Sequence, residues 1–131
     1  MAEIKSYPLD FYRNYLDIDD CSIIYRYCNG KQFEAATKLD LCECLNLRKP
    51  LVPVRLLDGE KQRMCYLISQ LLKHRVPAIS EMKKHWLKGV LAIFNITQSY
   101  YKSHYDDVGK NWTSGPNKKF YRTVKDILRR E

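Results

Sequence analysis

Apolar residues recur along the chain at helical spacing, and signals for β-strands are nearly absent. The clearest pattern is an i, i+3, i+4, i+7, i+8 stripe formed by Met64, Leu67, Ile68, Leu71 and Leu72. This spacing is typical of an amphipathic helix beginning near residue 60. Similar spacing predicts further helices over residues 8–16, 20–28, 31–47, 81–97 and 120–128. The pattern therefore predicts an all-α fold, a helical bundle of about five to seven helices.

Residues that break or cap helices separate these segments. Asn29-Gly30 supplies a left-handed stop after the second predicted helix. Pro50 and Pro53 exclude a helix between them, since proline lacks an N–H donor and restricts the residue before it. Gly89 lies inside the 81–97 helix, where it costs roughly 1 kcal/mol relative to alanine. We therefore expect close packing or a slight bend at Gly89.

One helix-loop-helix corner stands out between His74 and Trp86, where the chain reads H-R-V-P-A-I-S-E-M-K-K-H-W. A helix is predicted to end at His74, Pro77 restarts the chain, and Glu81 lies in the first turn of the next helix. This order of signals predicts two neighbouring helices joined by a short loop.

Composition changes beyond Tyr101. Residues 103–117 contain two glycines, a proline and a pair of aspartates, which predicts a loosely packed linker. Phe120, Val124 and Ile127 predict a short basic helix after it. The 131 residues thus divide into a helical bundle over 1–102 and a linker with a basic C-terminal helix over 103–131.

The net charge of +8 is concentrated at the C-terminal end. Residues 1–57 hold eight basic and eight acidic residues, whereas residues 110–131 hold seven basic and two acidic ones. This gradient suits contact with nucleic acid or an acidic partner, although solubility alone explains part of it.

Signs of catalytic or metal chemistry are sparse. There is no glycine-rich phosphate loop, and the three histidines lie too far apart for an H-E-x-x-H site. Cys42 and Cys44 would point about 200° apart on a helix, which disfavours zinc and favours burial as small apolar residues. We expect no enzyme activity, no cofactor and no metal; an enzyme whose site is assembled from scattered residues is the least favoured alternative.

Five cysteines without an export signal predict a reducing, intracellular compartment. The apolar runs are far shorter than the roughly 20 residues that cross a bilayer, so no membrane association is expected.

Several motifs together resemble the N-terminal domain of transcription elongation factor TFIIS and, within that group, the Iws/Spn family. The corner at His74–Trp86 is similar to the last corner of those domains. Ile93-Phe94-Asn95-Ile96-Thr97 through Lys102 is similar to their closing stretch, and Leu47-Arg48-Lys49-Pro50-Leu51 to their Leu-Pro hinge. The similarity covers about residues 31–102, with a single Gly59 where the family has a glycine pair.

The resemblance implies a compact right-handed bundle that works as a nuclear docking module in RNA polymerase II elongation and chromatin. The implied partners are the elongation complex and the acidic N-terminal region of the histone chaperone Spt-six. An acidic peptide with apolar anchors would seek an apolar groove rimmed by cations. The candidate rim residues are Arg48, Lys49, Arg55, Lys73, Arg75 and Lys83. The candidate groove residues are Tyr66, Ile79, Trp86 and Phe94, for which ordinary core packing is the alternative.

A second hypothesis is a small basic helical protein that binds nucleic acid. Phosphate contact through the C-terminal tail would be its main task. The candidate residues are Lys118, Lys119, Arg122, Arg129 and Arg130. A nuclear-import signal is a further interpretation of the same basic tail. The two hypotheses differ in salt dependence, because phosphate-driven binding weakens steeply with salt and apolar anchoring persists.

Overall fold

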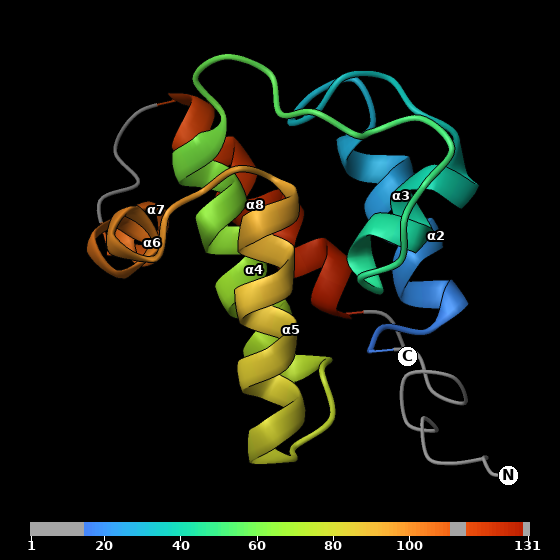
Figure 1. The fold of residues 1–131 in the computed structure, drawn as a ribbon. Helices are drawn as coiled ribbons and strands as arrows, with labels where there is room; N and C mark the ends of the chain where they lie inside the picture. Colours follow the sequence, from blue (N-terminus) through green and yellow to red (C-terminus); the bar gives the residue numbers. More distant parts are fainter. Residues whose placement is uncertain (1–14, 111–114, 130–131) are drawn as a thin grey trace, which may run out of the picture.

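The computed structural model describes residues 15–110 and 115–129, so most of the helix predicted over 8–16 lies outside the described residues. All regular elements in the described residues are helices, which confirms the all-α prediction (Figure 1). In chain order they are α2 (Ile18–Cys28), α3 (Lys38–Leu45), α4 (Lys61–His74), α5 (Ser80–Ile93), α6 (Gln98–His104), α7 (Asp107–Lys110) and α8 (Gly115–Arg129).

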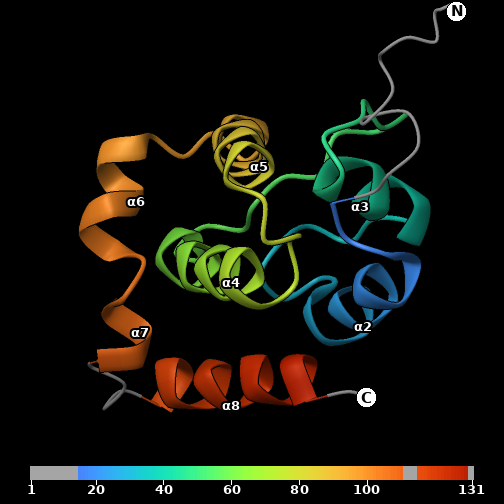
Figure 2. The ribbon, with the colours of Figure 1, turned by 90° about the horizontal axis from the view of Figure 1, so that it is seen from below.

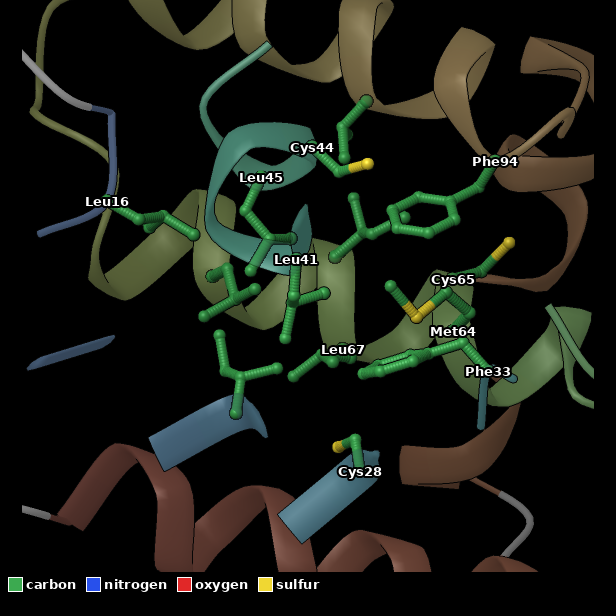
Figure 3. Packing of buried hydrophobic residues seen from close by; sticks show 14 of the residues in the cluster. Leu16, Cys28, Phe33, Leu41, Cys44, Leu45, Met64, Cys65, Leu67 and Phe94 are labelled. Atoms are coloured by element: carbon green, nitrogen blue, oxygen red, sulfur yellow. The ribbon is translucent and has the colours of Figure 1, made fainter. Parts of the chain in front are cut away.

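Helix α4 lies at the centre of the bundle. It packs against α5, α6, α7 and α8, which surround it in Figure 2. Four residues of the stripe that predicts this helix are buried and Leu72 is partly buried, and Met64 and Leu67 lie beside Phe33 in Figure 3. Contact on several sides explains why α4 also buries residues outside its stripe, because neighbouring helices cover most of its surface.

Helices α2 and α3 form a pair beside α4, and each begins at a capping side chain. The side chains of Asp17 and Thr37 accept hydrogen bonds from backbone N–H groups in the first turns of α2 and α3. Asn46, which follows α3, accepts a hydrogen bond from the Leu16 N–H over 2.9 Å. Its amide also donates to the Cys42 carbonyl at 3.2 Å. Asn46 therefore joins the segment before α2 to the end of α3.

The helix predicted from residue 31 is wrong before residue 37. Gly30 has a φ of +75°, and the backbone after it pairs with the 55–57 segment. The Glu34 N–H donates to the Arg55 carbonyl at 2.8 Å, and the Leu57 N–H donates to the Gln32 carbonyl at 3.0 Å. This antiparallel contact places Phe33 in the core. The bridge partner of Phe33 is Leu56, 23 residues away, and this pairing competes with helical hydrogen bonding. The local hydrophobic pattern does not report such a distant partner, so the predicted helix is wrong here.

The corner between α4 and α5 is confirmed, but α5 ends earlier than predicted. Asn95 has a φ of +59°, and the Ile96 N–H donates back to the Leu91 carbonyl at 2.8 Å. This hydrogen bond and that of Asn95 to Ala92 form a Schellman motif, which stops the helix at Ile93. Thr97 then caps α6.

The C-terminal part of the chain is more ordered than the predicted linker. Helix α6 continues to His104, α7 follows, and α8 starts at Gly115. Helix α8 packs against α2 and α4, and its apolar residues Phe120, Val124 and Ile127 belong to the same core cluster as the rest of the bundle (Figure 2). The C-terminal helix is thus part of the bundle.

Gly89 provides a test of the contact between α5 and Leu47, in the segment that follows α3. A Cβ atom at Gly89 would lie 2.7 and 2.8 Å from the two methyl groups of Leu47, so the predicted close packing is confirmed. We expect Gly89→Ala to destabilise the protein by about 1 kcal/mol, because crowding outweighs the gain in helix propensity. In a Leu47→Ala background the same change should instead stabilise by about 1 kcal/mol. A double-mutant cycle in urea measures this coupling, and strictly additive effects would contradict the proposed contact.

Candidate functional site

Three of the four predicted groove residues lie in the core. Trp86 has no exposed surface, and its indole N–H donates to the Leu45 carbonyl at 2.7 Å. Tyr66 and Phe94 are also buried, and Phe94 points into the apolar cluster in Figure 3. These side chains lie on the inward faces of helices that are covered from several sides. Of the four, only Ile79 is well exposed, at 47%, and of the three buried side chains only Phe94 also reaches a surface hollow.

Two of the predicted rim residues make internal contacts instead. Lys83 donates from its ammonium group to the carbonyl of Leu72, in the last turn of α4. Arg75 donates to the Leu128 carbonyl at 2.6 Å, and its Nε lies 3.3 Å from Asp20 Oδ1. Cations near unsatisfied carbonyls at helix C-termini stabilise those ends. Arg75 and Lys83 therefore join helices, which their positions along the chain did not reveal.

The remaining predicted rim residues are exposed but do not lie together. Arg48, Lys49 and Arg55 belong to the segment between α3 and α4, whereas Lys73 lies at the opposite end of α4. Arg48 is also engaged with Glu43.

Arg55 and Phe94 are the two predicted partner-binding residues that meet at a hollow. This hollow has a volume of about 430 Å³ and lies between residues 54–59 and the end of α5. Lys61 adds a second cation, and Leu56 and Leu57 add apolar surface.

Two strongly exposed apolar residues, neither of them a predicted site residue, lie just before residues 54–59. Leu51 is 91% exposed and Val52 61% exposed. The Leu51 N–H donates to Asp40 Oδ1 at 3.1 Å, which holds the segment beside the start of α3. Pro50 and Pro53 flank the pair and keep it out of a helix. An apolar pair between two prolines was the available signal.

Helix α8 carries a line of cations on its outer face. Lys118, Arg122, Lys125 and Arg129 are all exposed and occupy positions i, i+4, i+7 and i+11, so they project from one face over about 16 Å. We call these four residues the cationic stripe. The opposite face packs against α2 and α4, as described above, which fixes the direction of the stripe.

The stripe contains three of the predicted nucleic-acid-binding residues and one that was missed. Lys118, Arg122 and Arg129 were predicted; Lys119 is exposed next to the stripe, and Arg130 lies outside the described residues. Lys125 completes the i, i+4, i+7, i+11 spacing, which was the signal that could have identified it.

Two contacts modify the C-terminal half of the stripe. Arg129 pairs with Asp126 at 3.2 Å, and both side chains are largely exposed, so this ion pair is weak in water. The Lys125 ammonium lies 5.4 Å from the centre of the Tyr121 ring. That ring stacks on Tyr66, with 6.1 Å between centroids, and burial raises the pKa of Tyr66 to about 12. Lys125, in the C-terminal half of the stripe, therefore lies over one ring of a packed aromatic pair.

The titratable groups elsewhere have structural roles. All five cysteines are buried, and burial raises the pKa of Cys28 and of Cys65 to about 12. His104 hydrogen-bonds to Asp107 at 2.7 Å, and this bond lowers the pKa of the Asp107 carboxyl. Within residues 15–110 and 115–129, no three His, Cys, Asp or Glu side chains gather as metal ligands do. No helix in the same ranges is long and apolar enough to cross a membrane.

Comparisons with protein-family models, curated proteins and solved structures find no significant match to the chain.

Proposed function

We propose that the chain is a non-enzymatic helical protein that binds nucleic acid through α8. The observation that carries this proposal is the cationic stripe, in which four exposed cations share one face of a helix. Clustering of Lys and Arg along one helix is the electrostatic footprint of phosphate binding. Since Asp126 is the one acidic residue between Gly115 and Arg129, attraction to a polyanion is only weakly opposed along this helix.

The packing of α8 against the bundle favours a binding role for the cationic stripe over a role as an ordinary solvated helix face. Phe120, Val124 and Ile127 anchor α8 in the core, so the four cations keep a common direction without a partner. A preorganised set of charges loses less conformational entropy on binding than a flexible tail does.

Salt dependence tests this proposal directly. Titration of the full chain into a labelled 20-base-pair duplex of random sequence, followed by fluorescence anisotropy, measures the apparent affinity at several salt concentrations. Four phosphate contacts predict a slope of about −3.6 for log affinity against log salt, which is about a 10²-fold loss between 50 and 200 mM. Absence of binding at 50 mM salt, or a slope near zero, would refute the proposal.

A second candidate function follows from the resemblance to the Iws/Spn family. We propose that the chain docks an acidic segment, such as the N-terminal region of Spt-six, in the nuclear RNA polymerase II elongation complex. The hollow beside Arg55 and Phe94 supports this candidate, because its two cations outnumber its one acid, Asp58, and it also has apolar lining. The exposed Leu51 and Val52 extend the apolar surface along the same segment.

Calorimetry with a Spt-six peptide tests the docking candidate. Saturable binding should persist at high salt, and Arg55→Glu should weaken it about fivefold at low salt, the upper end for an exposed ion pair. Lys73→Glu makes the same charge change at the other end of α4 and serves as the matched control. Equal loss in both variants would place the peptide elsewhere, and no binding by the parent protein would remove this candidate.

A further inference from the structure

A second hollow lies next to the N-terminal half of α8. It has a volume of about 240 Å³ and is lined by residues from the end of α2, the turn after it, and the first turns of α4 and α8. Tyr27 provides partly exposed aromatic surface, whereas Phe120 is almost fully buried, and Lys31, Arg63 and Lys119 provide positive charge. Its volume lies below the roughly 300–1,000 Å³ of sites for drug-sized ligands, so it suits a smaller group.

Hydrogen bonds donated by Arg63 connect the residues that line two sides of this hollow. The Arg63 guanidinium donates to both carboxylate oxygens of Glu60, each at 2.8 Å, and to Asn117 Oδ1 at 2.7 Å. The first turns of α4 and α8 are thereby joined. Since Arg63 neutralises Glu60, the charges of Lys31 and Lys119 are left to attract an anion.

One polar atom of the lining residues has no hydrogen-bond partner within the described part of the chain. Gln32 donates from Nε2 to Glu60 at 3.3 Å, but its Oε1 is buried and accepts no hydrogen bond among the described residues. A buried acceptor without a donor is costly, so rotation of the Gln32 amide toward a ligand N–H group in the hollow would be favoured. The exocyclic amino group of a nucleobase is such a donor.

Lys119 connects the hollow to the cationic stripe. It lines the hollow and lies about 100° around α8 from its chain neighbour Lys118, the first residue of the stripe. A strand whose phosphates follow the stripe therefore brings its last nucleotide to the mouth of the hollow.

Resting on the proposed function, we infer that this hollow accepts one unstacked base of a single-stranded nucleic acid. The base stacks on Tyr27 and donates to Gln32 once its amide turns into the hollow, and the cationic stripe binds the phosphates that follow. A base inside a duplex cannot enter without being unpaired, so the hollow favours single strands over duplexes.

A variant that fills the hollow with a larger side chain tests base binding separately from phosphate binding by the cationic stripe. Thr123 lines the hollow and its hydroxyl donates only to the Lys119 carbonyl of its own helix, so Thr123→Tyr is a suitable blocking variant. We expect it to lower the affinity for a ten-nucleotide strand about tenfold, within the range for a lost stacked base, and to leave duplex affinity unchanged. Ala92→Tyr, at an exposed position of α5, is the matched control.

Two further measurements decide the assignment. A 2-aminopurine at the strand end should change its fluorescence on binding to the parent protein and not to Thr123→Tyr.

Lys31→Glu, an exposed substitution that leaves packing intact, should also reduce the preference for single strands. Unchanged single-strand affinity in both variants would overturn the inference while leaving duplex binding, and with it the proposed function, in place. Displacement of the strand by a phosphotyrosine peptide at equal concentration would overturn the assignment of the ligand.

Discussion

Replacing Trp86 by alanine is expected to destabilise the protein by about 3–5 kcal/mol, because it removes the largest fully buried side chain among the described residues. The loss also leaves the Leu45 carbonyl without the indole N–H that now binds it at 2.7 Å. Small domains have a total stability of about 5–15 kcal/mol, so the variant should lose a large share of its cooperative transition. Urea unfolding followed by circular dichroism measures the effect.

Two control variants identify the cause. Ile93→Ala shortens a side chain on the same helix that is exposed to solvent, and we expect a cost below about 1 kcal/mol. Trp86→Phe keeps much of the volume but loses the N–H donor, which separates packing from hydrogen bonding. If Trp86→Ala unfolded like the parent protein but lost a peptide ligand, the core role of Trp86 would be refuted and the groove hypothesis restored.

The helices that the sequence predicted well are those whose hydrophobic pattern and capping residues agree. Both ends of α4 and the start of α5 follow from the stripe through Met64 and Leu71 and from the Pro77 corner. The pairing of residues 32–34 with 55–57 could not be predicted, because it depends on a partner distant in the sequence. The early end of α5 depends on Asn95 adopting a left-handed conformation, which its sequence neighbours do not require.

The candidate site was predictable where charge and helical spacing coincide. Lys118, Arg122 and Arg129 lie on one exposed face because apolar residues occupy the opposite face, and the same spacing would have found Lys125. Arg75 and Lys83 show the limit of this reasoning. The sequence around the corner predicts that these two cations belong to the rim of a groove. Only the folded structure shows that Arg75 and Lys83 each bind a carbonyl at the end of a helix.

Reversing two charges of the stripe should nearly abolish nucleic-acid binding. At 0.1 M salt each phosphate contact contributes about 0.9 log units to duplex affinity, so Arg122→Glu/Lys125→Glu is expected to weaken binding about 60-fold. The salt slope should fall from about −3.6 to about −1.8, since two of four contacts are lost. Both side chains are exposed, so the fold should persist, and a thermal melt verifies it.

Lys84→Glu/Lys88→Glu is the matched control for this pair. Both lysines are exposed on α5 and lie four residues apart, so the net charge changes by the same amount on a different helix. If the stripe binds the phosphates, this control retains most of the affinity and nearly the full slope, because only long-range attraction is weakened and salt screens it. Equal losses in the two double variants would mean that net charge alone attracts the nucleic acid and that the geometry of α8 is irrelevant.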